Sequence, residues 1–146
     1  MSRGRAALRP GLLAGLLAAA LAAVGAGARA AEVDWTPFAE EDVVEILTAD
    51  PDGEPCETKV WVVVVGDAAY VRTNDSRWLA NIRRDPDVQM RVREREHPLL
   101  AEETSDREIT ERVEEAFKAK YGFMQRMMSA LRLREPTVLR LEPRER

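Results

Sequence analysis

The chain has 146 residues, which is enough for one compact domain. It contains 26 acidic and 22 basic residues, for a formal net charge of −4, and it has one Cys and one His. An acidic chain gains little from polyanions, so nucleic-acid and anionic-membrane binding are disfavoured; one Cys excludes an intrachain disulfide, and one His without a second His or Cys nearby does not indicate a zinc site.

The first 30 residues have the pattern of a secretory signal peptide. Three arginines precede residues 11–27, a run of Leu, Ala, Val and Gly, and Ala28 and Ala30 are the small residues that a signal peptidase recognises. We expect cleavage after Ala30, export to the periplasm or the medium by the general secretory route, and a mature domain of residues 31–146. Cleavage removes four arginines, so 18 basic residues then face 26 acidic ones and the net charge is about −8.

A membrane anchor is the alternative interpretation of the same segment. Its apolar run of about 17 residues is short and Gly-broken, whereas a spanning helix needs about 20 apolar residues. We therefore expect no stable membrane insertion once the leader is cleaved.

The first half of the mature domain predicts three strands, at residues 43–49, 58–65 and 69–73. Before them, Thr36 is placed to cap a short helical turn that begins at Pro37. Turn signals follow the first two strands, because Asp, Pro and Gly cluster there. The second strand contains six consecutive apolar residues, mostly Val, and is expected to be the central strand of the sheet, covered on both faces.

The second half predicts a helix after residues 74–76, strands at residues 88–94 and 98–103, a longer helix that Gly122 ends, a Met-rich helical segment, and a closing strand at residues 137–141. Ser105 and Glu108 have the spacing of a capping box, which places the start of the longer helix. Together these elements predict a mainly β (α+β) domain: a six-stranded antiparallel barrel with two or three flanking helices. Such a small core leaves little cavity volume, so a ligand would bind outside the barrel or between two copies.

The richest group of polar side chains runs from the end of a strand into a helix start. Arg72 and Arg77 supply guanidinium groups, Thr73 and Ser76 supply hydroxyls, and the helix start supplies backbone amides, which together suit a phosphate. Lys59 could add a further charge. The alternative interpretation is an ordinary helix cap flanked by solvated arginines.

At this segment the sequence resembles the pyridoxamine 5′-phosphate oxidase-like split barrels. Their strand, turn and helix commonly read aromatic-Thr-Asn, then Ser-Arg-Lys, then a helix ending in Asn-Pro before an alternating strand. The similar residues here are Val71-Arg72-Thr73-Asn74, Ser76-Arg77-Trp78 and Asp85-Pro86-Asp87-Val88. Deazaflavin-dependent nitroreductase-like proteins also look similar, in the Trp-containing helix, the Pro-linked strand and the ending over residues 138–144.

The resemblance covers residues 43–144 and implies a six-stranded split barrel, commonly a homodimer, that binds FMN or a deazaflavin coenzyme near the subunit boundary. It implies that Thr73, Ser76 and Arg77 face the cofactor phosphate or ribityl chain, with Lys59 on the preceding strand. Trp61 or Trp78 could stack on the flavin ring, although such residues are more often core. The candidate cofactor-binding residues are Lys59, Trp61, Arg72, Thr73, Asn74, Ser76, Arg77 and Trp78.

The sequence departs from the family pattern in three places. Trp78 replaces the usual Lys, the loop before Ser76 is one residue shorter, and Val64 and Val65 stand where the strand is usually basic. The C-terminal pattern that accompanies pyridoxamine phosphate oxidation is also absent, so that reaction is not expected.

Two functions therefore stay open. The first is a flavin- or deazaflavin-binding protein that carries out hydride transfer to a small molecule, with catalytic residues unassigned. The second is an exported, cofactor-free binding or interaction module that keeps the barrel and uses a Met-rich face, for a ligand or a dimer partner. The residues of that face are Met124, Met127, Met128 and Leu131.

Overall fold

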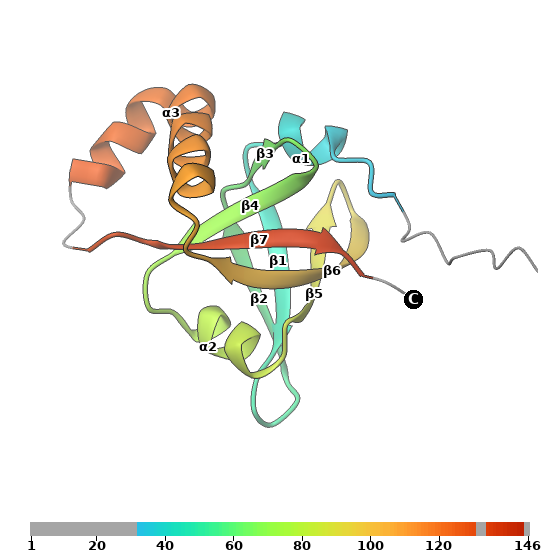
Figure 1. Ribbon diagram of the computed structural model, residues 1–146. Coiled ribbons are helices and arrows are strands. Elements are labelled where there is room, and N and C mark those ends of the chain that lie inside the picture. Colours follow the sequence, from blue (N-terminus) through green and yellow to red (C-terminus); the bar gives the residue numbers. More distant parts are fainter. Residues whose placement is uncertain (1–31, 131–133, 145–146) are drawn as a thin grey trace, which may run out of the picture.

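The computed structural model describes residues 32–130 and 134–144 (Figure 1). Its helices and strands are, in chain order, α1 (Thr36–Glu40), β1 (Val44–Ala49), β2 (Pro55–Val60), β3 (Val63–Val65), β4 (Ala68–Thr73), α2 (Arg77–Arg84), β5 (Asp87–Val92), β6 (Arg95–Thr104), α3 (Arg107–Ala130) and β7 (Thr137–Pro143). The predicted leader, residues 1–30, lies outside the described residues.

The strands form one antiparallel sheet in the order β2-β1-β5-β6-β7-β4-β3. This confirms a mainly β, antiparallel split barrel with flanking helices. The strand number differs from the expectation, since the sheet has seven strands instead of six. The extra strand arises because the long apolar run divides between two strands.

The division of that run explains how the barrel closes. β2 ends at Val60 and β3 begins at Val63, yet these two strands lie at opposite ends of the sheet order. The chain between those residues spans at most about 10 Å, so the two ends of the sheet must approach each other and the sheet curls (Figure 1). The expectation of one central strand over residues 58–65 is therefore wrong.

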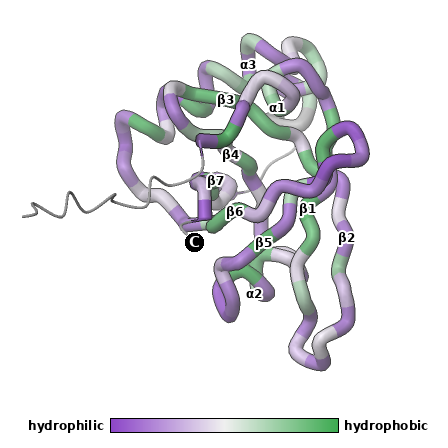
Figure 2. Tube along the Cα trace, turned by 90° about the vertical axis from the view of Figure 1, so that its right-hand side faces the viewer, coloured by the Kyte–Doolittle hydropathy of each residue, from purple (hydrophilic) through white to green (hydrophobic). Residues whose placement is uncertain are grey.

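Two hydrophobic cores account for the apolar composition of the run. Val60 and Val62 belong to the core inside the barrel, whereas Val63 packs with α3 in a second core on the outside. The strand that is buried on both faces is β4: Ala69 and Val71 face the barrel core, whereas Ala68 and Tyr70 pack in the outer core with α3. Figures 1 and 2 show α3 at one end of the molecule and α2, with the β1–β2 hairpin, at the other.

The helix starts differ by one residue from two of the expected caps. Trp35, instead of Thr36, precedes α1. At α3, the side chain of Asp106, instead of Ser105, accepts the hydrogen bond from Ile109 N at 3.0 Å. In both places an aspartate accepts a hydrogen bond from a free amide of the helix start: Asp34 from Thr36 N at α1, and Asp106 at α3. A carboxylate oxygen is a strong acceptor for such amides.

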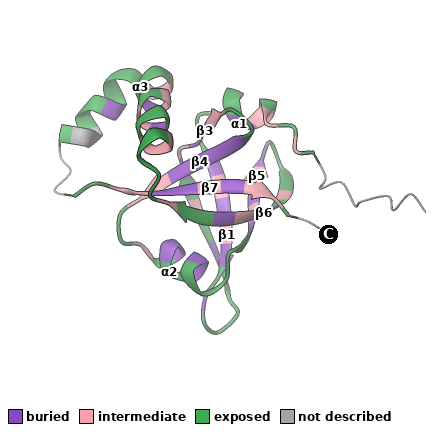
Figure 3. Cartoon of the chain, viewed as in Figure 1, coloured by how far each residue is buried: buried purple, intermediate pink, exposed green. Residues whose placement is uncertain are grey.

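The predicted break at Gly122 is confirmed. This residue has φ 51° and ψ −119° inside α3, so the helix consists of two segments. Met124 and Met127, in the second segment, are exposed. Figure 3 shows most of this segment of α3 in the colour of exposed residues. The side chain of Met128, and Leu131, lie outside the described part of the chain.

Candidate functional site

The connection between β4 and α2 holds its own hydroxyl groups in place. Ser76 is the N-cap of α2, and its Oγ accepts a hydrogen bond from Leu79 N at 3.2 Å. Thr73 Oγ1 lies 3.0 Å from Ser76 Oγ and donates to the carbonyl of Asn74 at 2.9 Å. The two hydroxyls predicted to face a phosphate are therefore adjacent, and both also stabilise the turn.

Arg77, the first residue of α2, is bound by the carboxylate of Asp50 from the β1–β2 hairpin. Its Nε donates to Oδ1 at 2.8 Å and its Nη2 donates to Oδ2, which is a two-point contact. The Arg77 side chain is 70% exposed, whereas that of Asp50 is only 7% exposed. Hydrogen bonding by Arg77 holds the pKa of Asp50 below its usual value, so the carboxylate stays ionised.

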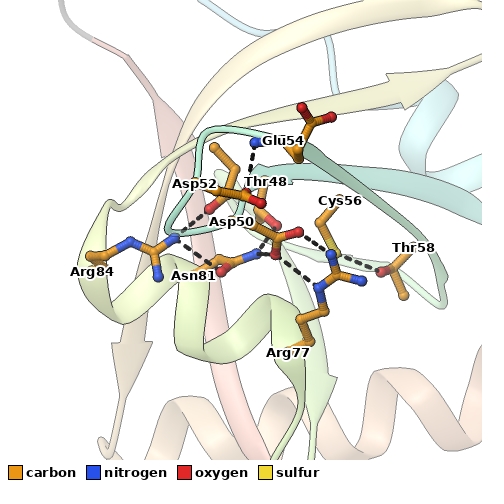
Figure 4. A network of polar contacts seen from close by, with 10 residues as sticks. Thr48, Asp50, Asp52, Glu54, Cys56, Thr58, Arg77, Asn81 and Arg84 are labelled. Atoms are coloured by element: carbon orange, nitrogen blue, oxygen red, sulfur yellow. Dashed lines mark hydrogen bonds and ion pairs between the residues drawn. The ribbon is translucent and has the colours of Figure 1, made fainter.

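Further side chains hold the Asp50 carboxylate (Figure 4). Asn81 Nδ2 donates to Asp50 Oδ1 at 2.9 Å and to Thr48 Oγ1 at 3.0 Å, and Asn81 is 2% exposed. Arg84 Nη2 in turn donates to Asn81 Oδ1 at 3.0 Å. We call Thr48, Asp50, Arg77, Asn81 and Arg84 the Asp50 network.

Sequence reasoning identified only Arg77 of this network. Arg77, Asn81 and Arg84 lie at i, i+4 and i+7 of one helix, so they share one face. That spacing was a usable signal for a polar helix face. Its partner Asp50 was predicted only as a turn residue, because nothing local in the sequence pairs residue 50 with residue 77.

Arg72 points away from the start of α2, because successive side chains of a strand face opposite sides. Its guanidinium donates hydrogen bonds to Glu114 and Gln125 of α3 and lies 3.8 Å from the centre of the Phe117 ring. The side chain is 5% exposed. The charge of Arg72 is therefore compensated within α3 and its surroundings.

Three other candidate residues also lie apart from Arg77. Cys56 and Thr58 of β2 lie beside the Arg77 guanidinium in Figure 4, so Lys59 is on the opposite face of that strand. Trp61 stacks on Tyr121 of α3, with 4.4 Å between ring centroids. The Trp78 side chain belongs to the barrel core.

The structure thus brings together four of the eight candidates: Thr73, Asn74, Ser76 and Arg77. A cofactor-binding role stays a prediction for all eight. The Asp50 network adds a buried carboxylate and an amide that sequence reasoning did not include.

A hollow of about 1100 Å³ lies between α3, the end of β6 and the start of β7, and of the eight candidate residues only Arg72 lines it. Arg72, Thr104, Thr110, Glu114, Arg134 and Thr137 are among the residues that line it. It is close to the start of α2, because Thr73 pairs with Thr137 and Arg134 Nη1 lies 3.8 Å from Asp75 Oδ2. The hollow is large enough for a planar ring system, since ligand pockets commonly measure about 300–1000 Å³.

Within residues 32–130 and 134–144, no three His, Cys, Asp or Glu side chains are grouped to hold a metal ion. Over the same residues, no helix combines the length and the apolar character needed to span a membrane.

Solved structures with the same fold belong to proteins of several kinds. The heme storage protein HutZ from Vibrio cholerae superposes with a TM-score of 0.63 at 18% identity, over 75% of this chain and 87% of that one. An FAD-binding protein from Mesorhizobium loti gives a TM-score of 0.57 at 14% identity, over 73% and 82% of the two chains. An F420-H2 dependent reductase gives 0.55 at 15% identity, over 70% and 95%.

These similarities confirm the split-barrel fold that the resemblance implied. Among curated proteins, no sequence matches the chain. One family of sequences does match, over residues 34–141, which is most of the described domain. The chain therefore belongs to the family described as "Uncharacterized protein conserved in bacteria (DUF2255)".

Proposed function

We propose that this chain is a split-barrel protein that binds a flavin or deazaflavin cofactor, with a phosphate of the cofactor beside Arg77 and its ring in the adjoining hollow. The observation that carries the proposal is the position of Arg77. Its guanidinium is held at one edge by Asp50, its side chain is 70% exposed, and the residue stands at the start of a helix. The FAD-binding protein and the F420-H2 dependent reductase of the same fold support a cofactor of this class.

The residues at the start of α2 fit a phosphate oxygen. The N–H groups of Arg77 and Trp78 precede the first intrahelical hydrogen bond, which runs from Ala80 N to Ser76 O at 3.1 Å. Amides in this position are suited to anions. Of the Arg77 nitrogens, Nε and Nη2 contact Asp50, and Nη1 contacts no acceptor among the described residues, so it is available to a ligand.

A bound flavin or deazaflavin would supply hydride transfer, and the protein would supply binding and orientation. In this proposal Arg77 and the first amides of α2 hold the phosphate, and Thr73 and Ser76 border it. We propose that a second copy of the chain completes the site, as the resemblance implies.

The test is a titration of the full chain with FMN, FAD and deazaflavin coenzyme, followed by absorbance and fluorescence. The wild type should bind at least one of them saturably, and Arg77→Ala should weaken this binding by about tenfold or more. Arg83→Ala is the matched control, because Arg83 lies on the same helix, at its other end, and pairs with Glu103. Absence of binding to all three cofactors by the folded wild type would overturn the proposal.

A specific observation also favours a second candidate, a cofactor-free binding module. The charges of Arg77 and Arg72 are both compensated, by Asp50 and by Glu114, so the site is less cationic than the sequence suggested. This candidate predicts the opposite result in the titration: the purified protein is colourless and binds none of the three cofactors.

We further propose that the protein is exported and loses residues 1–30. The mass of the protein recovered from its native host should then correspond to a chain that begins at Ala31. Recovery of the full-length chain from the cytoplasm would contradict export.

A further inference from the structure

We infer that Asp50 makes the Arg77 site selective for singly charged phosphate groups, as in a phosphodiester or a pyrophosphate linkage, over a terminal phosphate that carries two charges. The inference rests on the proposed function, because it concerns the ligand that binds beside Arg77. Asp50 then determines whether the site prefers a flavin cofactor with singly charged phosphates or one with a terminal phosphate.

The first step is that the Asp50 carboxylate cannot move away when a ligand arrives. Its Oδ1 accepts from Asn81 Nδ2 at 2.9 Å, and Asn81 is buried between α2 and β1. Its backbone is fixed as well, because Asp50 N donates to Glu54 O at 2.9 Å and Gly53 N donates to Asp50 O at 2.9 Å. A ligand must therefore bind Arg77 while the carboxylate remains in contact with it.

The second step is the charge of the site. Arg77 and Asp50 form an ion pair with no net charge, and Arg84 and Asp52, which also act on this pair, are of opposite sign. Cys56 lies beside the guanidinium as well (Figure 4). The other candidate cations do not add to the site, since Lys59 is on the opposite face of β2 and Arg72 is paired with Glu114.

The third step follows from Coulomb's law. Each additional negative charge on a ligand gains attraction from Arg77, and repulsion from the nearby Asp50 carboxylate offsets part of this gain. A group with one charge can still accept hydrogen bonds from Nη1 and the helix amides. A terminal phosphate with nearly two charges at neutral pH gains little further attraction here and gives up more hydration.

FAD and FMN share the same ring, but each phosphate of FAD carries one charge whereas the terminal phosphate of FMN carries nearly two. FAD also carries an adenosine group, so the ratio of the two affinities is compared between the wild type and a variant. At pH 8, the full-length wild type should bind FAD at least as tightly as FMN. Asp50→Asn keeps the shape and an oxygen acceptor but removes the charge, so the ratio of affinities should shift about tenfold toward FMN. Glu41→Gln is the matched control: it also removes a carboxylate that pairs with an arginine, Arg93, but it lies outside the site and the hollow, so it should leave the ratio unchanged.

A second measurement needs no substitution, in case Asp50→Asn does not fold. Lowering the pH from about 8 to about 5 protonates the terminal phosphate of FMN, whose second pKa is about 6. Asp50 stays ionised over this range because its pKa lies below the usual value. Binding of FMN to the wild type should therefore be as tight or tighter at the lower pH.

The outcomes separate the two ideas. A wild type that binds FMN about tenfold more tightly than FAD, or an Asp50→Asn ratio equal to that of the wild type, overturns the role of Asp50 and leaves the proposed function intact. Weaker FMN binding at the lower pH does the same. A folded wild type that binds no flavin cofactor overturns the proposed function, and the role of Asp50 with it.

Discussion

The ring of Trp61 stacks on the ring of Tyr121, with 4.4 Å between their centroids and 6° between their planes. Trp61 lies in the two-residue link between the edge strands β2 and β3, and Tyr121 comes from α3. The Tyr121 hydroxyl accepts from Val62 N at 3.0 Å and donates to Asp42 O at 2.7 Å. The neighbouring Lys120 Nζ donates to Val62 O at 2.8 Å. Helix α3 therefore holds the point at which the sheet closes.

Replacing Tyr121 by Phe should lower the free energy of unfolding by about 1–2 kcal/mol. The ring can still stack on Trp61, but the Val62 amide and the Asp42 carbonyl lose their partner. Urea denaturation followed by tryptophan fluorescence measures the change. Tyr121→Leu, which also removes the stacking, should cost about 1 kcal/mol more. A Phe variant as stable as the wild type would show that the hydroxyl does not hold the link.

The same residue predicts a dependence of stability on alkaline pH. Burial raises the pKa of Tyr121 to about 12, whereas tyrosine in an unfolded chain ionises near pH 10. The neutral hydroxyl therefore contributes its full stability below about pH 10, and this contribution is lost as the pH rises through about 12. The difference in unfolding free energy between the wild type and Tyr121→Phe should shrink over this range. A difference that stays constant up to pH 12 would contradict the prediction.

Asn81→Ala should destabilise the protein by about 2–3 kcal/mol. The substitution removes a buried amide and leaves Thr48 and Asp50 without their shared donor. Chemical denaturation gives the magnitude. Asn74→Ala serves as the control, since Asn74 is exposed and its replacement should change stability by less than about 0.5 kcal/mol. Equal effects of the two substitutions would argue against a buried Asp50 network.

Gly122→Ala should cost about 1–3 kcal/mol because of the backbone alone. A Cβ at this position would meet no atom within 4 Å, but φ 51° with ψ −119° is a conformation that residues with a side chain rarely adopt. Thermal unfolding monitored by circular dichroism measures the loss. Phe123→Ala is the neighbouring control: Phe123 is 64% exposed, and its loss should be nearly neutral. An Ala variant that is more stable and more helical would mean that α3 prefers to run straight.

Local signals in the sequence determined most of the elements. Ser76 caps α2, Gly122 interrupts α3, and the alternation of apolar residues over 88–92 gives β5, because each of these signals acts over a few neighbouring residues. The motif that the resemblance rests on also lies within one short stretch of the chain, from Val71 to Val88. It could therefore be recognised without knowing the fold.

Only the tertiary structure decided how residues 60–65 are used and what Arg77 contacts. Six consecutive apolar residues indicate that the segment is buried, but they do not show which part of the protein covers each residue. The sequence therefore predicted one central strand where the structure has two edge strands and the link between them. Likewise, the sequence around a charged residue does not show which residue will pair with it in the folded protein. Folding brings Asp50 to Arg77 from 27 residues away and Glu114 to Arg72 from 42 residues away, and these contacts set the charge of the site. Charge compensation depends on distance in space, which a linear pattern does not contain.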